Sequence, residues 1–415
     1  MNSLSNLRKS IGESFPAFKE NNFRYFWTGQ CISLLGTWMQ RTAQQWLVYT
    51  LTKSPLLLGL LGVAQFTPVL LFTLFTGVFI DRFNKKKVLI ITQSSLMILA
   101  FILAFLVWSK EVRYWQVLLI AVVMGCVNAW DMPTRQAFIP EMVGKRSIVN
   151  AIGLNSSVFN VARIAGPAFA GYMMVKFGTD VCFFLNGASF IAVIFGIILI
   201  KPKYSQKSKQ RGSILSDVKE GLKHIKSNKI ILATVLSVFA VGTFSMNSDV
   251  IIPSFATVVL HEGAAGYSFL LSIMGVGSFI AAISVATRAK KGPSKKMLFG
   301  SSVLVCIFQI LLLFTHSYGL SGIMLAIVGF FTVAFSASAN STIQINTSDE
   351  YRGRVMSVYT LANMGTTPFG NLFAGAITEK FNPNVGFFGC GFVALICMMP
   401  ILVMVKNTSF AKKKD

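Results

Sequence analysis

Residues 77–87, GVFIDRFNKKK, separate two long apolar runs and gather an acid, an arginine and three lysines between them. The lysines are typical of a segment held on the cytoplasmic side of a membrane. A plain stop signal of this kind does not account for Asp81, which can accept hydrogen bonds at the N-terminus of a neighbouring helix. We therefore expect a conformational latch at the inner surface, formed by Gly77, Asp81, Arg82, Lys85, Lys86 and Glu141.

The composition around this stretch is that of a membrane protein. The chain has 415 residues, of which 53% are hydrophobic and 13% charged, and its mean hydropathy is +0.63. A soluble protein carries about 25% charged residues. A soluble fold of this length also has too little interior to hide so much apolar surface.

Apolar runs of about 20 residues match the hydrocarbon thickness that a helix must cross. We expect spans at 26–50, 56–80, 88–108, 115–138, 151–175, 182–200, 230–253, 267–287, 298–315, 320–345, 358–379 and 384–405. The predicted fold is all-α and integral to the membrane, with twelve transmembrane helices.

The basic residues indicate the orientation of these spans. With the N-terminus inside, the cytoplasmic segments hold 30 of the 38 Lys and Arg residues and the outer loops hold 5. Cytoplasmic loops carry such an excess, so we expect a multi-pass protein of the plasma (inner) membrane with both termini in the cytoplasm. The net charge of +23 then reflects topology and contact with anionic membrane lipids, and no nucleic-acid partner is expected.

Two halves of six spans are related by an internal repeat. Arg82 and Arg288 both follow an apolar run and precede lysines, and AFAGYMMVKFG (168–178) is similar to LFAGAITEKFN (372–382). Repeats of equal orientation are typical of transporters whose halves rock about a midplane site. The expected segments are a lead-in (1–25), a first half (26–200), a linker with an amphipathic surface helix (201–229), a second half (230–405) and a basic tail (406–415).

Five charged residues fall inside the spans: Asp131, Arg135, Arg163, Arg41 and Asp249. Such a residue costs about 2.5–3.5 kcal/mol near a helix centre, so each invites a functional hypothesis. Burial disfavours ionised Asp131 and a nearby guanidinium favours it, so movement of Arg135 or Arg163 would switch its affinity for a proton. We expect these five residues to take part in proton coupling, and a static ion pair is the alternative.

Polar side chains elsewhere in the spans suggest a cavity for an organic molecule with polar and apolar parts. Such groups should face protein or water and not hydrocarbon, although many of them could form helix–helix hydrogen bonds instead. The candidates are Gln40, Gln44, Gln45, Trp46, Asn128, Asn155, Asn160, Asn247, Asn340, Gln344, Asn363 and Thr366.

Residues 77–87 resemble the signature loop between helices two and three of the major facilitator superfamily, with Asn84 in place of the usual glycine. Asparagine tolerates a left-handed turn, which would make this departure mild. Span five resembles the helix-five motif of the superfamily's antiporters at Gly166, Pro167 and Gly171. The stretches at 23–52, 128–143 and 367–379 are similar to the branch of enterobactin-type siderophore exporters and macrolide-efflux proteins, which implies proton-driven export of small molecules.

Several other functions are disfavoured. The chain has no G-x-x-x-x-G-K-[ST] phosphate loop, so direct ATP drive is not expected. Its three histidines are scattered and its cysteines form no C-x-x-C pair, so we expect no metal, no cofactor and no enzymatic activity. An importer, a lipid flippase and a membrane sensor without transport remain alternatives, and a monomer is expected.

Overall fold

A computed structural model describes residues 15–80, 83–201, 214–288 and 294–406, and in these ranges the chain is helical throughout with short connections. Asp81 and Arg82 of the expected latch lie outside the described residues. Two compact units are present: residues 1–43 with 71–210, and residues 44–70 with 211–415.

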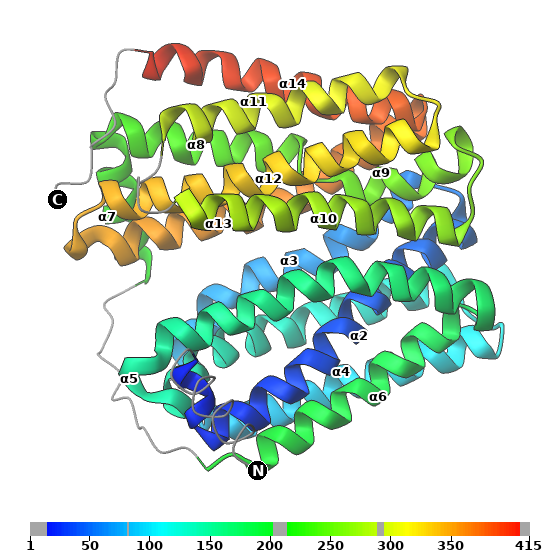
Figure 1. Cartoon of the computed structure of the whole chain (residues 1–415), viewed down its shortest axis with the longest axis horizontal. Helices are drawn as coiled ribbons and strands as arrows, with labels where there is room; N and C mark the ends of the chain where they lie inside the picture. The colour runs from blue at the N-terminus through cyan, green and yellow to red at the C-terminus, as the bar shows by residue number, and fades with distance from the viewer. Residues whose placement is uncertain (1–14, 81–82, 202–213, 289–293, 407–415) are drawn as a thin grey trace, which may run out of the picture. The chain divides into compact units, whose positions relative to one another are not determined.

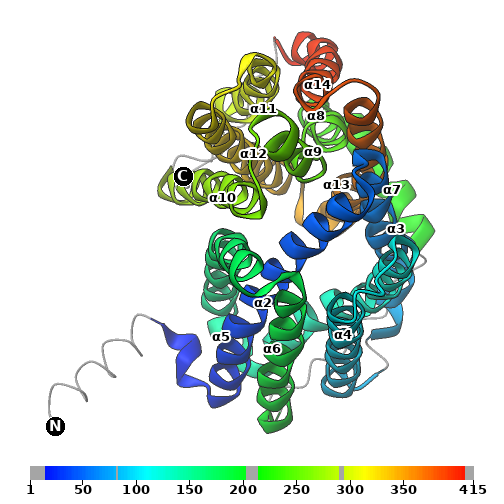
Figure 2. The same cartoon turned by 90° about the vertical axis from the view of Figure 1, so that its right-hand side faces the viewer.

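The first unit contains five long helices after a short 3-10 turn at Pro16–Lys19. They are α2 (Asn21–Thr52), α3 (Pro55–Phe79), α4 (Lys85–Trp108), α5 (Tyr114–Phe177) and α6 (Thr179–Leu199). Figure 2 looks nearly along α4, α5 and α6, which lie beside one another. Residues 44–70, the C-terminal part of α2 and the N-terminal part of α3, belong to the second unit, so the expected six-and-six division in chain order stays a prediction.

Helix α5 contains two membrane spans joined at Gly144. This glycine has φ 67° and ψ 169°, a combination that residues other than glycine rarely adopt. The two parts, Tyr114–Gly144 and Ser147–Phe177, are each long and apolar enough to cross a membrane. Spans four and five of the sequence therefore meet at a glycine kink and have almost no loop between them.

The second unit holds the remaining helices. They are α7 (Ile214–Ser227), α8 (Lys229–Phe244), α9 (Ser248–Ser254), a π-helical turn at Phe255–Val259, α10 (Ala264–Arg288), α11 (Lys295–Leu311), α12 (Tyr318–Asn346), α13 (Asp349–Lys380) and α14 (Pro383–Val405), and a 3-10 turn at Leu312–Phe314 follows α11. Figure 1 shows α12 beside α10 and α11, with α14 along the other side of α11.

The seventh span is broken between α8 and α9. Asn247, with φ −114° and ψ 25°, departs from helical geometry. Gln309 of α11 compensates for the interruption: its Nε2 donates to Ser245 O at 2.7 Å, and Ser245 Oγ donates back to its Oε1 at 2.5 Å. Irregular backbone at membrane depth needs such protein partners. The expected span at 230–253 is thus two helical pieces that end at Val259.

Asn84 begins α4 as its N-terminal cap. Its φ is −68° and its side chain accepts a hydrogen bond from Lys87 N at 3.2 Å. A capping asparagine satisfies an N–H that the first helical turn leaves free. The expectation that Asn84 replaces glycine in a left-handed turn is therefore wrong, because capping needs extended backbone.

Ten of the described helical segments are long and apolar enough to span a membrane. Helices α2 and α13 have 32 residues each and bring the set to the expected twelve, although they are more polar. The polarity of α13 comes mainly from charged residues at its two ends, and that of α2 comes in part from the predicted cavity residues Gln40, Gln44 and Gln45. A helix that faces a polar interior needs such a face, which lowers its hydropathy.

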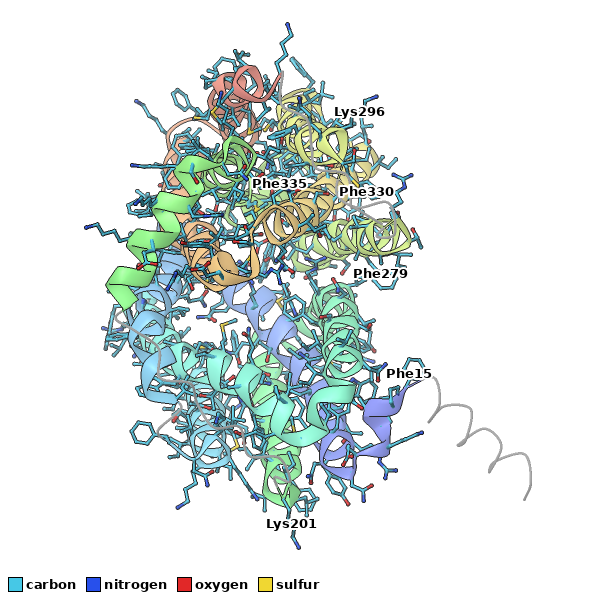
Figure 3. All side chains as sticks on the ribbon, turned by 90° about the vertical axis from the view of Figure 1, so that its left-hand side faces the viewer. Phe15, Lys201, Phe279, Lys296, Phe330 and Phe335 are labelled. Carbon is cyan, nitrogen blue, oxygen red and sulfur yellow. The ribbon has the colours of Figure 1, made fainter. Side chains whose placement is uncertain are left out.

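Large apolar side chains lie on the surface of the packed helices as well as in the core between them. Trp108, Phe105 and Ile91 are more than 60% exposed, a pattern that suits hydrocarbon and not water. The interior of the first unit includes the fully buried Phe23 and Phe138. In the second unit Phe335 of α12, labelled in Figure 3, is fully buried.

One face of helix α7 packs against the N-terminal part of α13. A Cβ on Gly221 would lie 2.8 Å from Arg354 O, so the two backbones are close. Arg354 Nη1 pairs with Glu220 Oε2 at 2.7 Å, and the rings of His224 and Tyr351 stack at 4.6 Å. The expected amphipathic helix is thus present with a protein partner, and its contact with the membrane surface stays a prediction.

Candidate functional site

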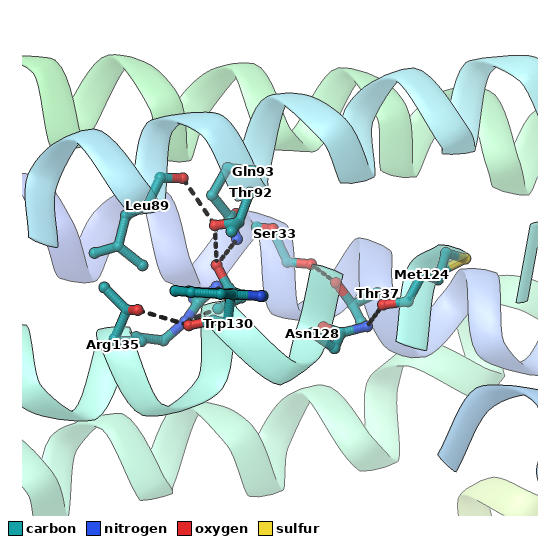
Figure 4. Close-up of polar contacts among 11 residues, drawn as sticks. Ser33, Thr37, Leu89, Thr92, Gln93, Met124, Asn128, Trp130 and Arg135 are labelled. Carbon is teal, nitrogen blue, oxygen red and sulfur yellow. Dashed lines mark hydrogen bonds and ion pairs between the residues drawn. The ribbon is translucent and has the colours of Figure 1, made fainter. Parts of the chain in front are cut away.

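An ion pair between Asp131 and Arg135 lies inside the first span of α5, and Figure 4 shows its surroundings. Arg135 Nη2 is 2.6 Å from Asp131 Oδ2, and Arg135 Nε donates to the same oxygen at 3.2 Å. The aspartate side chain is 4% exposed and the arginine side chain 20% exposed. The carboxylate is therefore sealed, whereas the guanidinium keeps some access to its surroundings.

Two side chains of α4 bind the other oxygen of Asp131. Thr92 Oγ1 and Gln93 Nε2 each lie 2.7 Å from Oδ1, and both residues are buried (Figure 4). Within the described residues, these two and Arg135 are all the polar contacts of the carboxylate. A buried charge is tolerated when it is paired and hydrogen-bonded in this way. Helix α4 thus holds one oxygen and α5 the other.

Pro133 lies between the two charged residues and leaves α5 helical. Because proline has no N–H, the carbonyl of Ala129, four residues earlier, loses its helical donor. Thr76 of α3 replaces that donor: its Oγ1 lies 2.8 Å from Ala129 O, and Thr76 is 2% exposed. A proline in a membrane helix needs such a neighbour, so α3 is joined to α5 about half a turn from Asp131.

Arg41 and Arg163 do not contact Asp131. Arg163 Nη2 lies 3.3 Å from Asn160 Oδ1 on the same helix, and the Arg41 guanidinium lies 5.2 Å from the centre of the Trp38 ring. Of the two expected tuning residues, Arg135 is paired with the carboxylate and Arg163 is not. The roles of Arg41 and Arg163 in coupling stay predictions, as does that of Asp249, which lies in the first turn of α9 in the second unit.

The two lysines of the expected latch, at the start of α4, bind to α5 and to the C-terminal end of α6. Lys85 Nζ is 2.7 Å from Glu141 Oε1, and both side chains are less than 15% exposed. Lys86 Nζ donates to the carbonyls of Ile198 and Ile200, each at 2.7 Å. A cation at the C-terminal end of a helix satisfies its free carbonyls and its dipole. Helix α4 is thus anchored to α5 and to the end of α6.

Gly166 of the helix-five motif lies where α5 meets α2. A Cβ at this position would be 2.4 Å from Trp38 Cβ and 3.1 Å from Met39 N, closer than ordinary contact allows. Glycine permits this approach, as small residues do at helix interfaces in membranes. Pro167 and Gly171 follow in the same helix and are buried. The motif therefore fits the packing of α5 on α2.

The predicted cavity residues divide into two groups. Gln40, Gln44, Asn247 and Thr366 are at most 3% exposed and bond within helix packing, for example Asn186 Nδ2 to Gln40 Oε1 at 2.7 Å. These hydrogen bonds account for part of their polarity, although Gln44 Nε2 has no hydrogen-bond partner among the described residues, and a cavity role for these four also stays a prediction. The half-buried or exposed residues are Gln45, Trp46, Asn128, Asn155, Asn160, Asn340, Gln344 and Asn363. For this second group the cavity role stays a prediction.

Residues 44–70 of α2 and α3 pack against other helices of the second unit. The Trp46 ring stacks on that of Tyr267 at 5.4 Å, and Tyr267 Oη donates to Gln45 Oε1 at 3.0 Å. A Cβ on Gly59 or Gly62 would collide with Asn371 of α13. In this conformation Gln45 and Trp46 are therefore engaged by protein side chains of α10.

In the described residues, the helices and their connectivity are those of the major facilitator fold. The chain matches a solved nucleoside transporter with a TM-score of 0.75 and 10% identity, over 94% of this chain and all of the other. A D-xylose–proton symporter matches with a TM-score of 0.72 and 12% identity, over 94% and 99%. At these identities the likeness establishes the fold alone.

A match to a family model over nearly the whole chain establishes the sequence family. A family model described as "Transmembrane secretion effector" matches residues 12–413, and the chain belongs to this family of the major facilitator superfamily. The resemblance found in the motifs is thereby confirmed. The chain is a multi-pass membrane transporter and not an enzyme.

Named relatives share nearly the whole chain at low identity. The staphyloferrin A transporter of Staphylococcus aureus is 24% identical, over 92% of this chain and 96% of the relative. Macrolide efflux protein A of Streptococcus pyogenes is 21% identical, over 94% and 98%. The multidrug efflux pump Tap of Mycolicibacterium fortuitum is 21% identical, over 85% and 88%. These matches place the chain among efflux and secretion transporters of small molecules.

Three residues at the Asp131 site were missing from the sequence prediction. Thr92 and Gln93 form a polar pair inside the apolar run of α4, and that interruption could have marked them. Thr76 is one of three threonines in the apolar helix α3, where threonine usually bonds its own backbone. Its partner, Ala129 O, depends on how α3 and α5 are aligned. No local pattern reports that alignment.

Proposed function

We propose that the chain is a proton-coupled exporter of small amphipathic organic molecules that works by alternating access in a bacterial plasma membrane. The observation that carries this proposal is the sealed Asp131 carboxylate, paired with an arginine that is itself less buried. A coupling group must gain and lose a proton as its partners move. Arg135 can leave Oδ2 more readily than Asp131 can leave its site.

A proton suits this site as the driving ion because its binding neutralises the Asp131 carboxylate. An elementary charge that moves through the membrane potential releases about 2.3 kcal/mol per 100 mV. Protonation of Asp131 removes the charge that makes Arg135 a partner. Loss of that attraction between helix positions is the kind of local electrostatic change that biases a two-state transporter. The static-pair alternative predicts no response of transport to the proton gradient.

The substrate class and direction follow from two kinds of support. The relatives are named for staphyloferrin A, for macrolides and for multiple drugs, and two of the names specify efflux. The half-buried amides and Trp46 offer mixed polar and aromatic surface, which suits an organic molecule better than a bare ion. Import and lipid flipping are the competing directions and substrates.

Reconstituted protein tests the role of the carboxylate. Substrate-driven proton flux in proteoliposomes should be lost in Asp131→Asn and retained in Glu111→Gln, a matched acid-to-amide change at an exposed residue outside the spans. Both variants should insert normally. Equal flux in Asp131→Asn and the wild type would refute the assignment.

Cells test the direction of transport. Expression should lower the accumulation of macrolides, other drugs or siderophores, and a protonophore should restore it. Accumulation that rises with expression would indicate import, and movement of labelled lipid alone would indicate a flippase.

We also propose that both termini are cytoplasmic and that the protein is a monomer. In a cysteine-free background, a single cysteine at Lys110 should react with an impermeant reagent added to intact cells. A cysteine at Ser227 should react only after the cells are permeabilised. The reverse pattern would contradict the orientation, and a dimeric mass in mild detergent would contradict the oligomeric state.

A further inference from the structure

We propose that Thr92 and Gln93 are positioning residues that bind Asp131 in both of its protonation states: both donate to the carboxylate, and one of them accepts the single O–H of the neutral acid. This inference rests on the proposed role of Asp131 as the coupling group. It adds two residues of α4 to the five that the sequence proposed for proton coupling. It also explains how proton uptake can release Arg135 while α4 and α5 stay joined.

Thr92 has two acceptors within reach for one hydroxyl hydrogen. Its Oγ1 lies 2.7 Å from Asp131 Oδ1 and 3.1 Å from Leu89 O, one turn earlier on α4 (Figure 4). A hydroxyl donates one hydrogen bond and can accept two. With Asp131 ionised, the hydrogen points to Oδ1. With Asp131 protonated, the acid O–H donates to Oγ1, and the threonine hydrogen turns to Leu89 O.

Gln93 provides a second and independent sign of two states. It is fully buried, its Nε2 donates to Asp131 Oδ1, and its Oε1 has no hydrogen-bond partner among the residues that the structure describes. A half-turn of the amide exchanges its donor and acceptor ends. In either orientation one end faces Asp131 and the other has no protein partner. When Thr92 accepts the acid O–H, Gln93 can keep donating to Oδ1; when the amide turns, Gln93 accepts that O–H in place of Thr92. Neither arrangement adds a new unpaired end to the amide.

The two oxygens of Asp131 consequently respond differently to a proton. Oδ1 keeps hydrogen bonds to α4 in both states. Oδ2 accepts only from Arg135, whose bonds are charge-assisted and weaken when the carboxylate becomes neutral. Proton uptake thus loosens the guanidinium and leaves the contact between α4 and α5 intact.

The charged surroundings of this site are sparse. Arg135 is the one charged group that contacts Asp131 within the described residues. The other charged residues of the neighbouring helices lie at different places. Lys85, which pairs with Glu141, begins α4 together with Lys86 and Lys87, and Asp180 begins α6. Helix α2 carries Arg24 and Arg41, and Lys19 lies in the turn before it. None of these contacts the carboxylate.

The test is the pH profile of substrate-driven proton flux in proteoliposomes. Thr92→Val removes a charge-assisted bond from the ionised state and a weaker neutral bond from the protonated state. The midpoint of the profile should therefore move upward by about 0.5–1 pH unit, while the substrate KM stays unchanged. Thr92→Ser keeps the hydroxyl and should retain the wild-type midpoint. Gln93→Met removes the other donor and should also raise the midpoint.

Three results would overturn the inference: wild-type midpoints in Thr92→Val and Gln93→Met, equal shifts in Thr92→Ser and Thr92→Val, or altered KM with an unchanged midpoint. Asp131→Asn in the same assay separates the two proposals. If it abolishes flux while the α4 variants behave as wild type, only this inference fails. If it leaves flux unchanged, the proposed coupling role itself fails.

Infrared spectra give a second measurement that does not depend on transport. The carboxyl band lost on Asp131→Asn at low pH should move to higher wavenumber in Thr92→Val, because the neutral acid loses an acceptor. An unmoved band would contradict the role of Thr92.

Discussion

The hydrogen bond from Thr76 to Ala129 O should be worth more with Pro133 present than without it. Thr76→Val removes the donor and leaves a buried carbonyl that α5 itself cannot satisfy, since residue 133 has no N–H. An unsatisfied buried acceptor costs about 1–3 kcal/mol. Hydrogen bonds in membrane proteins average about 0.6 kcal/mol and reach about 1.7, so we expect a loss of about 1–2 kcal/mol of unfolding free energy.

A double-mutant cycle isolates this effect. In Pro133→Ala the backbone N–H of residue 133 can bond to Ala129 O, so Thr76→Val should cost less in that background. The expected interaction energy is about 0.5–1.5 kcal/mol, within the range for residues in one hydrogen-bond network. Unfolding in mixed detergent and denaturant micelles measures all four proteins. An equal cost of Thr76→Val in both backgrounds would refute the reasoning.

Two further predictions concern the packing of α5 and its anchor to α4. Gly166→Ala places a Cβ 2.4 Å from Trp38 Cβ, so the helices must separate by about 1 Å, and overpacking of this kind costs about 1–3 kcal/mol. Its melting temperature in detergent should fall below that of Gly153→Ala on the same helix, where nothing lies within 4 Å, and equal melting temperatures would contradict the close contact. Glu141→Lys should destabilise the protein by about 1–3 kcal/mol, because it sets a cation against the largely buried Lys85. The exchange Lys85→Glu with Glu141→Lys should recover part of this loss in the same melting experiment, and no recovery would indicate that the pair is not in contact.

Local patterns predicted those parts of the structure that depend on one helix at a time. Apolar runs located the spans, and the four-residue spacing put Asp131 and Arg135 on one face, where they form an ion pair. The break at Asn247 escaped the prediction because Ser245 to Ser248 lie within a run that remains apolar on average. Hydropathy averages over a window and does not respond to backbone geometry.

Features that depend on the alignment of distant helices were not predictable. For Gln40 and Gln44 the sequence reports polarity within a span and nothing about their partners, and their cavity role stays a prediction. In the structure Gln40 accepts from Asn186, and Gln44 accepts from Gln65. The assignment of residues 44–70 to the second unit likewise reflects contacts with segments about 200 or more residues away, such as Tyr267 and Asn371.

The central claim is that Asp131 couples transport to protons and is not merely half of a structural pair. The most direct measurement compares two activities of Asp131→Asn in the same proteoliposomes. Exchange of labelled for unlabelled substrate needs no proton movement and should persist. Substrate accumulation driven by a pH gradient should be lost. Loss of both activities in a normally folded variant would indicate a structural role, and retention of gradient-driven accumulation would contradict the account.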